Sequence, residues 1–70
     1  MTDLKMLEDV IRESGMTMVA LSKKSGIKRE TLYNRLKGVG EFKVSEMTGI
    51  SRALNISDEQ RDKIFFANAV

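Results

Sequence analysis

Residues 17 to 37 read Thr-Met-Val-Ala-Leu-Ser-Lys-Lys-Ser-Gly-Ile-Lys-Arg-Glu-Thr-Leu-Tyr-Asn-Arg-Leu-Lys, and this stretch decides the fold. Thr17 has the hydroxyl that a helix N-cap needs, and Gly26 is a natural C-terminal stop for the helix that follows. A second helix over residues 28–37 carries two leucines four positions apart, which share one face. The stretch therefore predicts two short helices joined by a tight turn.

Such a pair has the parts of a helix-turn-helix, in which two helices cross steeply over a turn of three or four residues. Gly26 tolerates the positive φ that the turn requires, and Ala20 and Ser22 are small enough for the backbones to approach each other. Four apolar residues are expected to point into the core: Leu21, Ile27, Leu32 and Leu36.

The other side of the helix over 28–37 carries polar side chains that suit the edges of base pairs. Arg29 can bond guanine O6 and N7, Asn34 can pair with adenine N6 and N7, and Glu30 can accept from cytosine N4. Glu30 is equally explained by the helix macrodipole, and Tyr33 by covering the edge of the core. The predicted base-reading residues are Lys28, Arg29, Glu30, Tyr33 and Asn34.

The net charge of +2 is distributed unevenly along the chain. Residues 1–21 sum to −2 and residues 44–70 to −1, whereas residues 22–43 hold seven basic and two acidic side chains and sum to +5. Taken alone, such a charge run is better explained by a solvated surface than by a phosphate-binding face, so the helical pattern must decide between them. We predict that Lys37 and Lys43, which flank the next loop, bind phosphates, while Lys23 and Lys24 are equally explained as solubilising charge.

Three further helices complete an all-α bundle of about five helices, folded as a single domain over residues 1–70. The first is expected over about 3–14, with Thr2 or Asp3 as its N-cap, and the fourth has an apolar stripe between Val44 and Leu54. The fifth opens at a capping box, Ser-x-x-Gln over 57–60, and runs to Phe66. Between these helices, Phe42 is expected to fold back onto the core, and Gly49 indicates close contact between helices.

The composition argues against several other classes of protein. The chain has no Cys and no His, so it lacks thiolate ligands and the commonest general base, and we predict no enzyme activity, cofactor, metal site or small-molecule substrate. No apolar run approaches the roughly 20 residues that span a bilayer, and the first residues lack a signal-peptide pattern. We therefore expect a protein of the cytoplasm with no membrane association. Without disulfides or a thiolate metal site, helix packing must supply nearly all of its stability.

The run Ala-Leu-Ser-Lys-Lys-Ser-Gly-Ile-Lys-Arg-Glu-Thr-Leu-Tyr-Asn-Arg-Leu-Lys-Gly, over 20–38, resembles the helix-turn-helix of phage Cro proteins and related repressors. Glu-Phe-Lys-Val-Ser-Glu-Met (41–47), Ala-Leu-Asn-Ile-Ser (53–57) and Ile-Phe-Phe (64–66) resemble segments of small Cro-like proteins of phages and prophages, so the resemblance covers nearly the whole chain. It implies the lambda repressor-like DNA-binding fold and homodimeric binding to a double-stranded operator. It also implies a role in phage development inside a bacterial host, at the nucleoid when bound.

The chain departs from that family at three positions. Ser22 replaces the usual Ala and is small enough to fit. Met18 stands where related repressors often have a phosphate-binding Gln, so we predict that Thr17, or the amides of this helix N-terminus, takes over that contact. Arg35 occupies a position that is often apolar, which predicts a slightly rotated helix.

The resemblance implies a dimer, and the apolar C-terminus offers a surface for it. We predict an interface that includes Phe65, Phe66 and Val70, although completion of the monomer core explains the two phenylalanines equally well. The leading function is a sequence-specific transcription regulator of the Cro-like repressor type. The alternative is a protein-binding adaptor or inhibitor built on the same scaffold.

Overall fold

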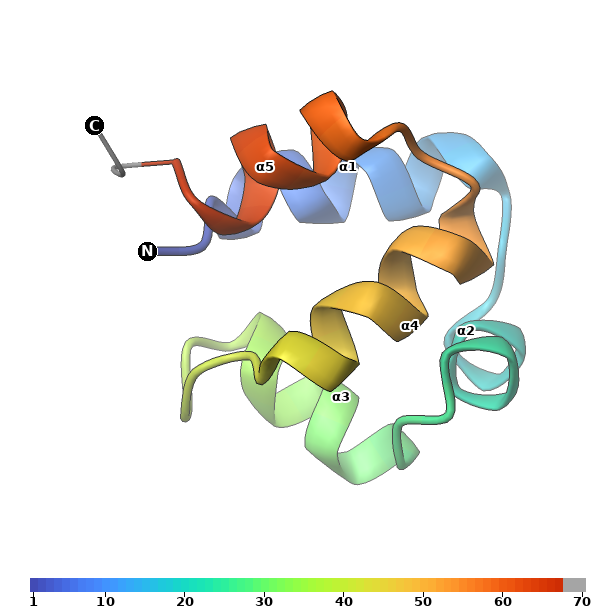
Figure 1. Ribbon diagram of the computed structural model, residues 1–70. Helices are drawn as coiled ribbons and strands as arrows, with labels where there is room; N and C mark the ends of the chain where they lie inside the picture. The colour runs from blue at the N-terminus through green and yellow to red at the C-terminus, as the bar shows by residue number, and fades with distance from the viewer. Residues whose placement is uncertain (68–70) are drawn as a thin grey trace.

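The computed structural model describes residues 1–67, and in this range the chain forms five helices and no strand (Figure 1). Their bounds are α1 Leu4–Ser14, α2 Met18–Ser25, α3 Arg29–Leu36, α4 Val44–Leu54 and α5 Asp58–Phe65. The predicted all-α bundle is confirmed. The expected boundaries differ from these by one or two residues, mainly because N-cap residues such as Lys28 and Ser57 lie just outside the helices that they begin.

Side-chain caps begin three of the helices. Asp3 Oδ1 accepts a hydrogen bond from the Met6 amide at 3.0 Å, and Thr17 Oγ1 and Ser57 Oγ accept from amides three residues ahead, each at 3.1 Å. Gly15 and Gly26 end α1 and α2 with φ values of 72° and 77°, the left-handed region that glycine enters without strain. The predicted capping box at Ser57 is half formed, because no bond from the Gln60 side chain returns to Ser57 within the described residues.

Helix α4 lies at the centre of the molecule, with α1 and α5 side by side on one flank and the α2–α3 pair on the other (Figure 1). Helix α2 makes its most extensive packing with α4. At the crossing, a Cβ on Gly49 would lie 2.2 Å from the Ser25 carbonyl oxygen. The expected close contact at Gly49 is therefore confirmed, and only a glycine permits it.

The core contains residues from every helix, together with one from the turn after α2 and one from the loop before α4. The Phe42 and Phe65 rings meet edge to face, with centroids 5.4 Å apart and an interplanar angle of 71°. This confirms that Phe42 folds inward and joins its loop to α5. Leu36 is half-buried and packs on the core from outside. The buried apolar residues are Leu7, Ile11, Leu21, Ile27, Leu32, Phe42, Ile50, Ile64 and Phe65.

The first residues of the chain run beside the end of α5. The Asp3 amide donates to the Ile64 carbonyl oxygen at 2.6 Å, and the Ala67 amide donates to the Met1 carbonyl oxygen at 3.2 Å. These bonds tie the N-terminal segment to the last helix. Among the described helices, none is long and apolar enough to cross a membrane.

Candidate nucleic-acid interface

The turn between α2 and α3 consists of residues 26–28 and is held by its own hydrogen bonds. The Gly26 amide donates to the Ser22 carbonyl oxygen at 3.0 Å, and the Ser22 hydroxyl donates to the Ile27 carbonyl oxygen at 2.5 Å. Ile27 is buried beneath the turn. The sequence predicted only that Ser22 would fit, whereas its hydroxyl closes the turn. The sequence shows that Ser22 has a hydroxyl able to donate a hydrogen bond, but only the folded turn shows that the Ile27 carbonyl oxygen accepts it.

The predicted base-reading residues lie together on the outward side of α3 and at its N-cap. At 100° per residue, the four base-reading candidates within α3 (29, 30, 33 and 34) fall within an arc of about 140°, on the side away from the fully buried Leu32. Lys37, a predicted phosphate-binding residue, lies within the same arc. Tyr33 is 45% exposed, which leaves its ring and hydroxyl accessible to a partner. Asn34 is half-buried at the edge of this surface, while the other four base-reading candidates are exposed.

Most basic side chains of residues 22–43 have no acidic partner among the described residues. The ion pairs of α1 and α5 use Arg12, Arg61 and Lys63, which lie away from the turn. Within 22–43, Arg35 alone is in an ion pair. Six exposed cations there are left for an external anion: Lys23, Lys24, Lys28, Arg29, Lys37 and Lys43.

The three predicted phosphate-binding residues lie at helix ends around α3. Thr17 is the N-cap of α2, Lys37 the C-cap of α3 and Lys43 the N-cap of α4. The Thr17 oxygen accepts from the Ala20 amide, so its O–H is still able to donate to a phosphate oxygen. All three side chains are exposed.

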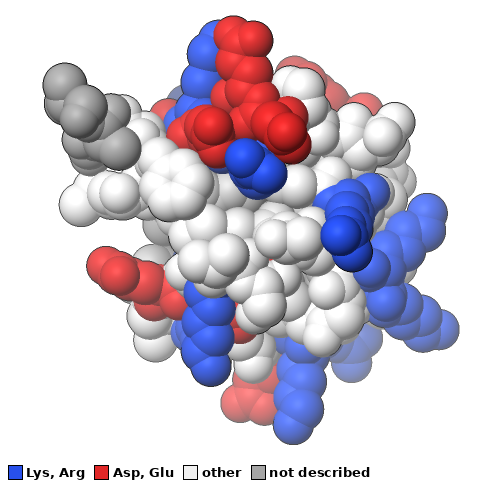
Figure 2. All heavy atoms as spheres, viewed as in Figure 1, with Lys and Arg blue, Asp and Glu red and all other residues white. Residues whose placement is uncertain are grey.

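Charge is distributed unevenly over the molecule. Figure 2 shows the largest group of acidic side chains over α5, whereas most basic side chains project along the edges formed by α2 and α3. Glu30 on α3 and Glu41 in the following loop are the exposed acidic exceptions near those edges. A face of this kind attracts a polyanion and orients it toward α3.

A family model described as helix-turn-helix matches residues 7–60, more than half of the chain and the whole α2–α3 unit. The chain belongs to the Cro-like helix-turn-helix family. The comparisons with curated proteins and with solved structures found no match. As a member of this family, the protein is a DNA-binding transcription regulator.

In this helix-turn-helix protein Arg35 points toward the bundle and fastens the loop after α3. Its Nε lies 3.3 Å from Glu46 Oε1, and its Nη1 donates to the Val39 carbonyl oxygen at 3.2 Å. The two charged side chains are only 18% and 13% exposed. The sequence marked Arg35 as a departure, but its partner lies eleven residues ahead in another helix and had no local signal.

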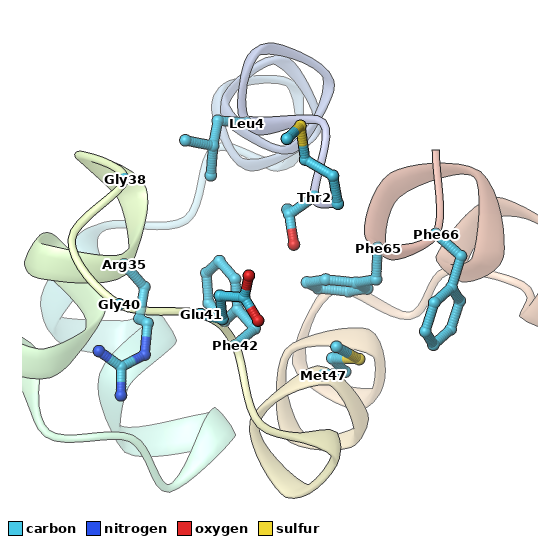
Figure 3. A pocket seen from close by; sticks show the side chains of 11 residues that line it. Thr2, Leu4, Arg35, Gly38, Gly40, Glu41, Phe42, Met47, Phe65 and Phe66 are labelled. Atoms are coloured by element: carbon cyan, nitrogen blue, oxygen red, sulfur yellow. The ribbon is translucent and has the colours of Figure 1, made fainter. Parts of the chain in front are cut away.

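The two phenylalanines predicted for a dimer interface lie in different environments. Phe65 is 1% exposed and belongs to the core, so it has no surface to offer a partner, and its part in the predicted interface needs correcting. Phe66 follows the last turn of α5 and is 43% exposed. Figure 3 shows Phe65 pointing toward Phe42, with Phe66 farther out. Val70 lies outside the described residues.

Proposed function

We propose that the protein is a sequence-specific repressor of the Cro-like phage or prophage type, which reads the major groove of its operator with the helix over residues 28–37. The observation that carries the proposal is the outward face of α3, on the side away from the buried Leu32. Five polar side chains lie on this face, and none has an ion-pair partner among the described residues: Arg29, Glu30, Tyr33, Asn34 and Lys37. A helix of this diameter enters the major groove, where each base pair presents a distinct pattern of donors and acceptors.

Base reading is assigned to the start and middle of α3. Arg29, in the first turn, donates two parallel hydrogen bonds to guanine, and Asn34, about 1.4 turns further along the helix, pairs with adenine. Lys28 has no side-chain capping bond and extends toward a base or its phosphate. Glu30 and Tyr33 lie between these residues on the same face and complete the surface.

Phosphate binding is assigned to residues that border α3. Thr17, Lys37 and Lys43 lie at the ends of three helices, where they contact the backbone on either side of the groove and set the register of α3. The positive end of the α2 dipole adds to the contact at Thr17.

The operator is bound by a homodimer. One half-site gives little affinity, whereas two recognition helices about 34 Å apart meet successive major grooves of one duplex. Phe66 is the side chain that supports this proposal, because it is a large exposed apolar group near the end of α5.

The test is selection of bound duplexes from a random pool, followed by titrations at several salt concentrations. We expect a palindromic consensus, with affinity that falls steeply as salt rises. Arg29→Ala should relax preference at one base pair by about 1–3 kcal/mol, and Lys43→Ala should weaken all sequences alike. Lys5→Ala, an exposed cation on α1, is the control of equal charge. If no sequence is enriched, or if Arg29→Ala discriminates as the wild type does, the proposal fails and the protein-binding alternative gains support.

A further inference from the structure

Arg35 and Glu46 join the C-terminal half of α3 to the N-terminus of α4 across the loop over residues 37–43. This loop begins at Lys37 and ends at Lys43, the two predicted phosphate-binding lysines that flank it. The ion pair therefore bridges the loop that determines where Lys43 stands relative to α3.

The first half of the loop is bound to α3. The Val39 amide donates to the Asn34 carbonyl oxygen at 2.9 Å, and the Val39 carbonyl oxygen accepts from Arg35 Nη1. Gly40 has a φ of 75°, and a Cβ there would lie 2.4 Å from Arg35 Nη1. Figure 3 shows the Arg35 side chain beside Gly40, so the loop backbone bends closely around the guanidinium.

The second half of the loop is bound to α4 through the same carboxylate. Glu46 Oε1 accepts from the Lys43 amide at 2.8 Å and also from Arg35 Nε. One carboxylate oxygen thus holds the guanidinium of α3 and the N-cap amide of α4 together. The Lys43 side chain takes no part in these bonds and stays exposed.

We propose that Arg35 and Glu46 are positioning residues for DNA binding, which hold Lys43 at a phosphate beside the recognition helix. The inference rests on the proposed function. Neither residue needs to touch DNA, because each acts through the loop backbone that leads to Lys43. Lys37 is already held by α3, since its amide donates to the Tyr33 and Asn34 carbonyl oxygens at 3.1 Å.

The proposal and simple electrostatics predict opposite results for Glu46→Ala. Removing a negative charge beside a phosphate-binding surface should strengthen binding to a polyanion. If Glu46 positions Lys43, the same substitution should weaken binding, because the N-cap amide and the guanidinium both lose their acceptor. Glu41→Ala is the matched control, since Glu41 lies exposed in the same loop and has no hydrogen bond or ion pair within residues 1–67.

The experiment measures binding of each variant to the duplex enriched by the wild type, by fluorescence anisotropy across a range of salt concentrations. We expect Glu46→Ala to bind about tenfold more weakly than Glu41→Ala, with a salt slope smaller in magnitude by about 1, because the phosphate contact of Lys43 is lost. Glu46→Gln keeps the oxygen that accepts from the Lys43 amide and should recover most of the slope.

A variant at the partner residue keeps the proposal testable if Glu46→Ala does not fold, which circular dichroism will show. Arg35→Lys preserves the net charge but cannot bond Glu46 and Val39 with the same geometry, and should also reduce the slope. If the folded Glu46 and Arg35 variants match Glu41→Ala in affinity and slope, the pair is merely structural and the inference is overturned. If the wild type itself shows no salt-dependent DNA binding, the proposed function fails, and the inference fails with it.

Discussion

Arg29 and Arg35 lie in the same eight-residue helix, yet their guanidinium groups meet different surroundings. Arg29 is exposed and has no acidic partner among the described residues, whereas Arg35 is mostly buried against Glu46. The difference follows from position on the helix, because residues six apart are rotated by about 240° at 3.6 residues per turn. The same side chain is thus the proposed base reader in one place and fastens a loop in the other.

Ser51 has a buried polar atom, its side-chain hydroxyl oxygen. It lies buried in α4, and its hydroxyl has no hydrogen-bond partner among the described residues. A buried hydroxyl without a partner costs free energy because its bonds to water are lost and not replaced.

We expect Ser51→Ala to increase the free energy of unfolding by about 1 kcal/mol, because it removes the unpartnered hydroxyl and favours the helix. Thermal and urea denaturation measure the change. Ser45→Ala, at an exposed position of the same helix, is the control and should shift stability by much less. A loss of stability in Ser51→Ala would mean that the hydroxyl has a partner in solution.

At the scale of elements, the packing of α2 against α4 fixes the position of the helix-turn-helix on the rest of the domain. Helix α2 packs on α4 more extensively than on α3, the other helix of the helix-turn-helix. At Gly49 there is no room for a side chain, because a Cβ would meet the carbonyl group of Ser25, the last residue of α2. A backbone contact of this kind places α2 firmly, and the hydrogen-bonded turn after it then orients α3.

Gly49→Ala should destabilise the protein by about 1–3 kcal/mol, because the added methyl group forces α2 away from α4. Helix propensity alone predicts the opposite sign, a gain of about 1 kcal/mol. Chemical denaturation distinguishes the two. We also expect weaker DNA binding, since α3 moves with α2. A variant more stable than the wild type would show that the helices do not meet at this point.

Across the whole molecule, most exposed cations and the exposed Phe66 lie in different regions. Most cations without an ion pair among the described residues lie between α2 and the N-cap of α4, while acidic side chains and their ion pairs concentrate on α1 and α5. Phe66 lies beside this second flank, at the end of α5. A dimer formed there would leave the cationic face of each subunit free for one half-site.

Phe66→Ala should dissociate the proposed dimer while the subunit stays folded, as measured by analytical ultracentrifugation and circular dichroism. Phe65→Ala is the contrasting variant, because loss of a buried aromatic side chain costs about 3–5 kcal/mol and should unfold so small a domain. A Phe66→Ala protein that remains dimeric but melts at lower temperature would assign both rings to the subunit core and refute the interface.

Local signals were sufficient for the helices, the turn and the basic segment. A cap such as Thr17, a stop such as Gly26 and the spacing of Leu32 and Leu36 act over a single turn of chain, so neighbouring residues carry all the necessary information. The charge of residues 22–43 is likewise a property of the chain itself.

Packing between distant segments settled the rest. Which of Phe65 and Phe66 enters the core depends on Phe42, more than twenty residues away, and the role of Arg35 depends on Glu46 in the next helix. Even the hydroxyl of Ser22 acquires its acceptor only once the turn has closed. Partners of this kind are chosen by the three-dimensional arrangement of helices, because periodicity says which face a residue occupies and not what that face will meet.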